Sequence, residues 1–371
     1  MRVALLTRRF DPAGGGTERD LMITASYLRA NGHDVKIYAN EVRSTDPEFP
    51  VKGISRPRSS RSLGLLRFAQ MAPKIARDDG AELVLSFART IGADVLRSGG
   101  GAHISYVRTA RQWRGSISGS SMWLDPYHRM QMRIERKGFR SASLKLAIAV
   151  SNLVRDDLIG SFRIGQGRVT TLYNGVDLER FSPLIDPAER REVRRSLGLT
   201  EHDPVVIFIG NGFARKGLGF LLKAWPMLRN RAQLLVVGED RAAIRFRALA
   251  KKVGSSRIVF AGPRSDGAAL LKAAGMLVLP SLFEPFGNVV MEALASGLPV
   301  LVSRQVGAAE LLPEAMRPYI VDAPGNTSEI AARLDELIEN HHALRGLARA
   351  TAESHTWDAY GRRLMELLGS L

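Results

Sequence analysis

The sequence of 371 residues contains no cysteine, which excludes disulfides, thiolate metal ligands and a thiol nucleophile. Acidic residues are fewer than basic ones: the sequence contains 37 Asp and Glu and 53 Lys and Arg. No stretch approaches the roughly 18 consecutive apolar residues of a membrane-spanning helix, and the opening MRVALLT lacks the apolar core and cleavage site of a secretory signal. We therefore expect a cytoplasmic protein.

The basic excess amounts to a formal net charge of +16. Such a field attracts phosphate, whether in nucleic acid, in lipid headgroups or in a nucleotide substrate. A basic bias of the whole source proteome would leave the same excess. The charge alone therefore indicates an anionic partner without choosing among these classes.

Short apolar runs rich in β-branched residues alternate with helix-length amphipathic segments. Continuous apolar runs are typical of parallel strands buried on both faces. Strands are predicted at 3–7, 35–39, 83–87, 146–150, 205–209, 234–237, 258–260, 276–280 and 299–302, and helices at 18–30, 187–197, 218–228, 242–253, 268–274, 289–296 and 326–339. The alternation predicts an α/β fold with doubly wound parallel sheets.

The order of strand, glycine-rich loop and helix begins a second time after residue 205. We therefore predict two Rossmann-like domains that face each other across a cleft, an N-terminal acceptor domain over 1–172 and a C-terminal donor domain over 173–355. A final helix at 356–371 is expected to pack back onto the first domain. Ligands of such folds bind at the carboxyl ends of the strands.

The segment from Glu284 to Glu292 carries the strongest local signal. The amides of Phe286, Gly287 and Asn288 are predicted to lie at a helix N-terminus, where a phosphate or the polar edge of a sugar binds. Glu292, about two turns into that helix, can accept hydrogen bonds from the cis diol of a ribose. Either glutamate alone is equally compatible with a solvated surface charge, but the full string favours a binding site.

Arg215 and Lys216 follow the first strand of the second half of the chain. Fixed cations at that place stabilise the negative charge that develops on a departing diphosphate. The sequence contains no Asp-x-Asp motif to hold a divalent ion, so we expect neither a metal nor a cofactor. In the first half, Gly14, Gly15 and Gly16 permit a close approach of the backbone to a ligand.

Taken in chain order, these motifs resemble the retaining family 4 glycosyltransferases with the GT-B fold, and among them the lipopolysaccharide core glucosyltransferases. The resemblance spans nearly the whole chain and is carried by five segments, at 11–20, 98–103, 174–177, 213–217 and 284–300. A nicotinamide dehydrogenase is disfavoured because the first loop lacks the Gly-x-Gly-x-x-Gly spacing.

The resemblance implies a retaining, metal-independent transfer of a hexose from a nucleoside diphosphate sugar, UDP-linked, to a saccharide acceptor on a membrane-anchored glycolipid such as lipopolysaccharide core. It implies that His103 contacts the sugar and that Asp20 acts on the acceptor hydroxyl, although a helix-terminal aspartate also stabilises the helix dipole. The catalytic set is then Asp20, His103, Arg215, Lys216 and Glu284, and the donor-binding set is Gly15, Gly16, Arg215, Lys216, Arg264, Glu284, Phe286, Gly287, Asn288 and Glu292.

Residues 104–145 differ from the rest of the chain in composition. They contain nine Lys and Arg against only Asp125 and Glu135, with Tyr106, Trp113, Trp123 and Tyr127 interleaved. Basic side chains attract anionic headgroups, and Trp and Tyr favour the membrane interface. The segment predicts peripheral docking on the cytoplasmic face of the inner membrane. A solvated insertion is the alternative, and no nucleic-acid-binding module accompanies the charge.

Two other functions fit the same shape. A nucleotide-sugar epimerase shares the double Rossmann architecture, although the two glutamates argue against it. A non-catalytic module that binds glycolipid or phosphate is the second. Nothing in the sequence indicates the oligomeric state, the donor sugar or the acceptor linkage.

Overall fold

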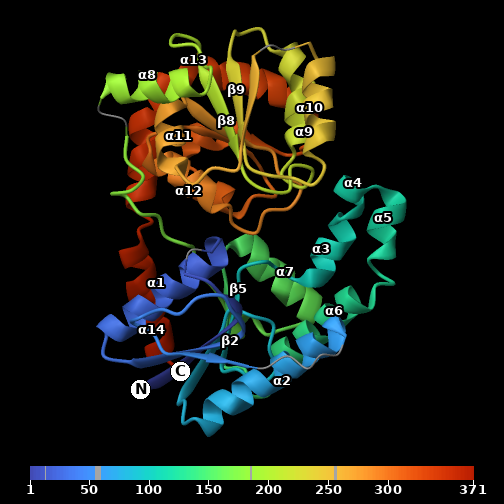
Figure 1. Cartoon of the computed structure of the whole chain (residues 1–371), viewed down its shortest axis with the longest axis vertical. Coiled ribbons are helices and arrows are strands. Elements are labelled where there is room, and N and C mark those ends of the chain that lie inside the picture. The colour runs from blue at the N-terminus through green and yellow to red at the C-terminus, as the bar shows by residue number, and fades with distance from the viewer. Residues whose placement is uncertain (13, 55–59, 184–185, 255–256) are drawn as a thin grey trace. The chain divides into compact units, whose positions relative to one another are not determined.

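The computed structural model describes residues 1–12, 14–54, 60–183, 186–254 and 257–371. The chain divides into two compact units (Figure 1). Unit 1 comprises Met1–Asn174 and Trp357–Leu371, and unit 2 is the continuous segment Gly175–Thr356. Thus the last helix of the chain belongs to unit 1.

Unit 1 contains a seven-stranded sheet whose strands all run parallel. The spatial order is β3-β2-β1-β4-β5-β6-β7. The strands are β1 (Arg2–Phe10), β2 (Asp34–Val42), β3 (Val51–Gly53), β4 (Leu83–Ser86), β5 (Val95–Ser98), β6 (Leu146–Ala149) and β7 (Val169–Thr171). The helices are α1 (Gly16–Ala30), α2 (Arg61–Asp78), α3 (His103–Thr109), α4 (Arg111–Arg114), α5 (Ser116–Ser121), α6 (Pro126–Phe139), α7 (Asn152–Phe162) and α14 (Trp357–Gly369), with a 3-10 turn at Gln166–Arg168.

Unit 2 contains a six-stranded parallel sheet in the order β10-β9-β8-β11-β12-β13. Its strands are β8 (Val205–Ile209), β9 (Gln233–Val237), β10 (Ile258–Gly262), β11 (Met276–Leu279), β12 (Val300–Ser303) and β13 (Ile320–Val321). Its helices are α8 (Pro187–Ser196), α9 (Leu218–Ala224), α10 (Ala243–Lys252), α11 (Gly267–Ala273), α12 (Asn288–Ala295) and α13 (Thr327–Glu353), with 3-10 turns at Trp225–Met227, Gly307–Leu311 and Glu314–Tyr319.

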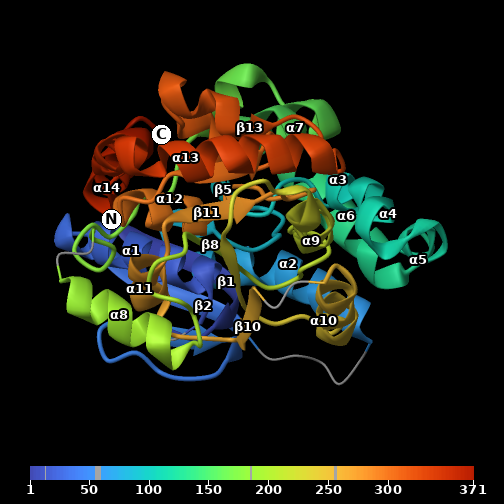
Figure 2. The same cartoon turned by 90° about the horizontal axis from the view of Figure 1, so that it is seen from above.

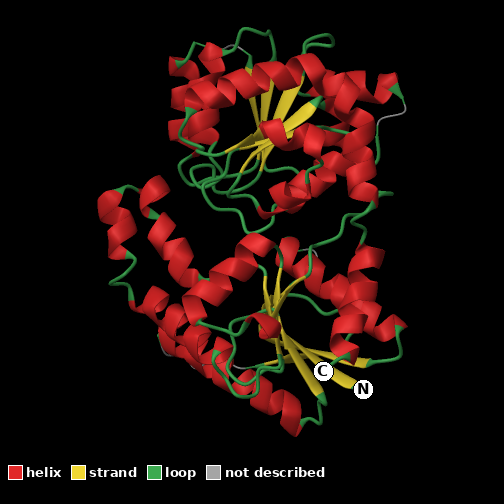
Figure 3. Ribbon diagram, turned by 180° about the vertical axis from the view of Figure 1, so that it is seen from behind, coloured by secondary structure: helices red, strands yellow, loops and turns green. Residues whose placement is uncertain are grey.

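Both sheets have the doubly wound Rossmann order, with helices on the two faces of each (Figure 3). The central strands β4, β8 and β11, and residues 3–7 of β1, are almost completely buried because helices cover both faces, which explains their largely apolar sequences. The strand order reverses between β1 and β4 in unit 1 and between β8 and β11 in unit 2. Loops that leave the carboxyl ends of those pairs diverge and leave space for ligands.

The predicted α/β class is confirmed, while several elements differ from expectation. The short strands β3, β5, β7 and β13 were not predicted, and β5 contains Arg97 in a run of only four residues. Helix α13 continues to Glu353, well beyond the predicted end at residue 339, and Gly346 lies inside it without ending it. Helix α9 ends at Ala224, and a 3-10 turn that contains Pro226 follows it.

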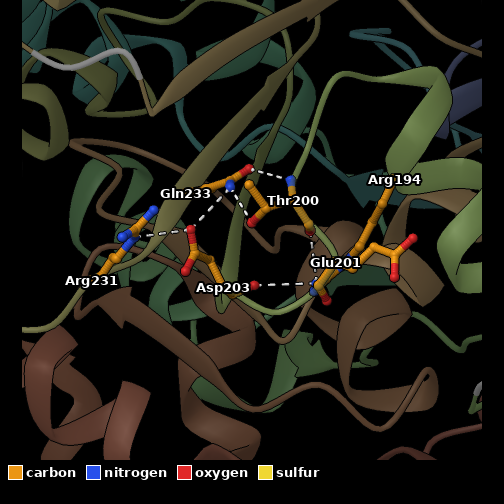
Figure 4. Close-up of polar contacts among 6 residues, drawn as sticks. All are labelled: Arg194, Thr200, Glu201, Asp203, Arg231 and Gln233. Atoms are coloured by element: carbon orange, nitrogen blue, oxygen red, sulfur yellow. Dashed lines mark hydrogen bonds and ion pairs between the residues drawn. The ribbon is translucent and has the colours of Figure 1, made fainter.

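The buried side chain of Arg194 connects α8 by hydrogen bonds to the amino-terminal side of the unit 2 sheet (Figure 4). The Arg194 guanidinium donates to the carbonyl oxygens of Thr200 (3.2 Å), Glu201 (2.6 Å), Asp203 (3.2 Å) and Ala273 (2.9 Å). Burial, together with the nearby charge of Arg190, lowers the pKa of Arg194 to about 10. These contacts shape the loop that leads into β8, at the opposite end of that strand from the loop that carries Arg215 and Lys216.

Helix α14 packs on α1 and completes the core of unit 1. Tyr360, Leu364 and Leu368 are buried in the same cluster as Leu21 and Leu28 of α1. The hydroxyl of Tyr360 also lies 3.0 Å from that of Thr24. None of the helices in the described part of the chain combines the length and the apolar character needed to cross a bilayer.

Candidate active site

In unit 2 the loops that follow β8 and β11 meet at the point where the strand order reverses. The amide of Leu282 donates to the carbonyl of Arg215 at 2.8 Å, which joins the two loops directly. The amide of Glu284 donates to Gln305, and the carbonyl of Glu284 accepts from Gly307, so a third loop after β12 holds the same segment. The backbone of the predicted donor loop is therefore fixed on both sides.

Arg215, Lys216 and Glu284 form one ionic cluster. Oε2 of Glu284 lies 2.8 Å from Nζ of Lys216 and 3.1 Å from Nη1 of Arg215. Burial raises the pKa of Glu284, but the charges of Lys216 and Arg215 and their hydrogen bonds outweigh it, so the pKa lies below its ordinary value. The carboxylate is thus ionised, and two cations against one anion leave a net positive site at the carboxyl edge of the sheet.

Two glycines allow the cationic turn to pack this closely. Gly217 has φ +81°, and a Cβ there would overlap the carbonyl oxygen of Pro280 at the end of β11. Gly210 has φ +147°, and its Cβ would lie 2.8 Å from Nζ of Lys216. A larger residue at Gly217 would displace the turn that carries Arg215 and Lys216, and a larger residue at Gly210 would displace the Lys216 side chain.

The remaining donor-site residues predicted in unit 2 lie close by in the chain. Gly287, with φ +91°, is the N-cap of α12, and Asn288 is its first residue. Phe286 is buried, whereas Glu292 is partly exposed on α12 one turn after Asn288. Arg264 follows β10, two strands away from β8 in the sheet, and there it forms an ion pair with Asp266 at 2.5 Å.

In unit 1 the predicted residues lie at the carboxyl edges of β1 and β5. Gly15 is the N-cap of α1 and Gly16 is its first residue, and both are exposed. Asp20, by contrast, is buried: its Oδ2 accepts from Arg97 (2.9 Å) and from Asn174 (3.2 Å). These hydrogen bonds link α1 to β5 and to Asn174, which ends the first segment of unit 1. The action of Asp20 on an acceptor hydroxyl stays a prediction.

His103 begins α3 and is buried, and one of its ring nitrogens is hydrogen-bonded. Nε2 lies 2.9 Å from Nδ1 of His128 on α6, and the two rings stack with centroids 5.1 Å apart. The amide of His103 donates to Glu135 at 2.8 Å. Burial, with the charges of Arg89 and His128, lowers the pKa of His103 to about 3, so the imidazole is neutral. A sugar contact through Nε2 of this ring would have to replace the bond to His128.

Comparison with known proteins places this geometry in a family. Residues 14–180 match the domain model described as Glycosyltransferase Family 4, and residues 203–340 match the model described as Glycosyl transferases group 1. The chain belongs to the GT-B glycosyltransferases.

Individual relatives agree with this membership. The glycosyltransferase is 27% identical to the lipopolysaccharide glucosyltransferase WaaG of Escherichia coli K12 over 341 residues, which cover 89% of this chain and 87% of WaaG. A crystal structure of WaaG, described as involved in lipopolysaccharide biosynthesis, superposes with a TM-score of 0.80 at 23% identity over 98% of this chain and 99% of that one. Anabaena Alr3699/HepE in complex with UDP and glucose superposes with a TM-score of 0.76 at 19% identity over the full length of both chains. The chain spans 54–56% of the length of several further relatives.

Unit 1 of the glycosyltransferase contains a cavity of about 210 Å³ at its own reversal of strand order. The walls come from the start of α1, the segments after β4 and β5, and α6. The polar lining includes Arg89 and Glu135, which pair at 2.5 Å, and Arg97. Sequence reasoning missed these residues, and the one available signal was Glu135, a lone acid among the cations of α6.

The basic segment 104–145 forms α3 to α6 and the turns between them. Helices α4 and α5 lie beyond α6, away from the strands of unit 1 (Figures 1 and 2). Every Lys and Arg of the segment is exposed, and Leu124 is 77% exposed beside the partly buried Trp123. The segment therefore presents cations and apolar side chains to solvent together.

Proposed function

We propose that this glycosyltransferase moves a hexose from a UDP-sugar to a saccharide acceptor on a membrane-anchored glycolipid of the lipopolysaccharide core type, with retention of configuration and without a metal. The observation that carries the proposal is the cluster of Arg215, Lys216 and Glu284 at the strand-order reversal of unit 2. Its surplus positive charge suits a diphosphate, and its glycine-dependent packing keeps the cations in place before substrate binds.

In the proposed reaction, the bond between the sugar C1 and the β-phosphate oxygen breaks while the acceptor oxygen bonds to C1 on the same face. The acceptor proton passes to the departing diphosphate. Lys216 and Arg215 stabilise the charge that grows on that leaving group. Each makes one contact with Glu284, so further N–H donors remain to contact phosphate oxygens.

The identity of both substrates rests on relatives. WaaG is named as a lipopolysaccharide glucosyltransferase, and the HepE structures are complexes with UDP, glucose or UDP-glucose. We assign the donor to unit 2, with Phe286, Gly287, Asn288 and Glu292 around the sugar and ribose and Arg264 near the base. We assign the acceptor to unit 1, where Asp20 acts on its hydroxyl, and we assign Gly15 and Gly16 to the donor phosphates and His103 to the transferred sugar.

A turnover assay tests the proposal. UDP-glucose, UDP-galactose and GDP-mannose are each incubated with a truncated lipopolysaccharide core glycolipid in detergent micelles, and released nucleotide and glycosylated lipid are measured. We expect one UDP-sugar to be consumed. Lys216→Met should lower kcat about 100-fold without changing the melting temperature, whereas Lys223→Met, an exposed lysine on the neighbouring α9, should behave as wild type. Equal rates for both variants would refute the role of Lys216, and isomerised donor without transfer would indicate an epimerase.

We further propose that residues 104–145 dock on the cytoplasmic face of the inner membrane. About 1 kcal/mol for each cation near an anionic surface suffices for reversible binding when several act together. In vesicle flotation, recovery should be high with phosphatidylglycerol and low with phosphatidylcholine alone. A variant with Arg108, Arg111 and Arg114 changed to Gln should lose most of that difference. Equal recovery on both vesicle types would contradict the proposal.

A further inference from the structure

Arginines at the carboxyl edge of the unit 1 sheet fall into two groups. Arg9, Arg89 and Arg97 each form an ion pair, with Glu18 (2.7 Å), Glu135 (2.5 Å) and Asp20 (2.9 Å) respectively. Arg8 at the end of β1 and Arg61 at the start of α2 have no carboxylate partner among the described residues. The remaining ten residues, at 13, 55–59, 184–185 and 255–256, include no Asp or Glu in the sequence. The charges of Arg8 and Arg61 are therefore uncompensated.

These two guanidinium groups meet at Tyr127 near the start of α6. Nη1 of Arg8 donates to the hydroxyl of Tyr127 at 3.0 Å, and Cζ of Arg61 lies 3.8 Å from the centre of its ring. A tyrosine accepts a hydrogen bond and attracts cations to its face, but it carries no charge to offset theirs. Two like charges held on one neutral side chain repel each other unless an anion joins them.

The surroundings add to the positive field. Burial raises the pKa of Tyr127, but the hydrogen bond from Arg8 and the charges of Arg8 and Arg61 lower it overall. Burial lowers the pKa of His128, and the charges of Arg114 and Arg61 lower it further. Asp125 is the carboxylate that acts against them, and its Oδ1 is already bonded to the amide of Tyr127 at 2.7 Å.

Donor atoms remain unused at this place. Nε of Arg8 is buried without a hydrogen-bond partner in the described structure. Buried N–H donors are normally satisfied, so an unsatisfied one beside an uncompensated charge points to a ligand with anionic oxygens. Arg61 is exposed, so the site opens to solvent. Guanidinium groups form paired hydrogen bonds with phosphate, which suits this arrangement.

We propose that Arg8, Arg61 and Tyr127 bind a phosphate group carried by the saccharide acceptor. The inference rests on the proposed function and deepens it, because it assigns the acceptor a phosphorylated sugar. The site continues to the cavity of unit 1: His128 follows Tyr127 and contacts His103 at 2.9 Å, and the amide of His103 bonds to Glu135 in the cavity wall. A sugar in the cavity would then present its phosphate to the two arginines.

Binding of a soluble probe tests the site without requiring turnover. Glucose 6-phosphate and glucose are titrated into the full chain by calorimetry. We expect glucose 6-phosphate to bind and glucose to bind at least about tenfold more weakly, since each charge-assisted bond contributes about a factor of ten. The double variant Arg8→Gln/Arg61→Gln should lose this preference. Arg67→Gln/Arg191→Gln, which removes the same charge from exposed positions on α2 and α8, should keep it.

The proposal would be overturned by unchanged glucose 6-phosphate binding in Arg8→Gln/Arg61→Gln, or by loss of that binding in Lys216→Met, which would place the probe in unit 2. It would also be overturned if Arg8→Gln/Arg61→Gln lost flotation on phosphatidylglycerol vesicles while its sugar phosphate binding stayed intact, which would indicate a lipid headgroup site. The single variant Arg61→Gln changes an exposed side chain and is therefore expected to fold. It should lose part of the preference for glucose 6-phosphate over glucose. A failed turnover assay with intact glucose 6-phosphate binding would refute the proposed function and leave the phosphate site standing.

Discussion

The contact between Gly217 and Pro280 leads to a quantitative prediction about Gly217→Ala. Alanine at a positive φ costs about 1 kcal/mol. In addition the new Cβ would lie 2.7 Å from the carbonyl carbon of Pro280 and closer still to its oxygen, so the turn has to move. Overpacking of this kind costs about 1–3 kcal/mol. The expected total is about 2–4 kcal/mol of unfolding free energy.

A matched control separates the two contributions. Gly198 also lies in unit 2, has φ +69°, and has nothing within 4 Å of its Cβ position. Gly198→Ala should therefore cost only the backbone contribution of about 1 kcal/mol. Because multidomain chains depart from a single two-state transition, the free energies are taken from the unit 2 transition in urea denaturation. Gly217→Ala should also weaken donor binding, since the moved turn carries Arg215 and Lys216. Equal destabilisation by the two substitutions would refute the reasoning.

Three further predictions concern other parts of the molecule. Arg194→Met should destabilise unit 2 by about 3 kcal/mol, because buried carbonyl acceptors lose their donor; a loss below 1 kcal/mol in urea denaturation would contradict this. Since the pKa of His103 in the folded chain is about 3, against an ordinary value of 6.5, the unfolded chain takes up a proton first, so stability falls as pH falls below 6.5. Between pH 7.5 and 5.5 the loss should be about 1 kcal/mol larger in wild type than in His103→Gln, as followed by calorimetry. Gly361→Ala should destabilise unit 1 by about 1–3 kcal/mol, because its Cβ would lie 2.5 Å from Cγ of Tyr27 on α1, whereas Gly369→Ala, which has open space around it, should change stability little.

The parts of the fold that could be predicted are those encoded locally. Strands such as β8 and β11 are continuous apolar runs bounded by glycine or proline, and their type follows from pattern alone. Strand β5 could not be predicted from its own sequence, because Arg97 interrupts its apolar run. Arg97 is buried only because Asp20 and Asn174, both 77 residues away in the chain, bring acceptors to it.

The same distinction applies to the candidate site. Arg215 and Lys216 are adjacent, and the glycines on either side of them indicate a special turn, so the cationic loop could be predicted from its own sequence. The ring contact between His103 and His128 could not, since it depends on how α6 packs against α3. Nor could the contrast between paired and unpaired arginines, because pairing depends on tertiary neighbours rather than on spacing.

The division of the chain has a consequence for its synthesis. Unit 2 is one uninterrupted segment, whereas unit 1 takes α14 from a segment that follows unit 2 in the chain. A ribosome therefore releases all of unit 2 before α14 emerges to cover Leu21 and Leu28. A nascent chain that stops within unit 2 leaves that apolar surface exposed. The core of unit 1 can therefore be completed only after all of unit 2 has been translated.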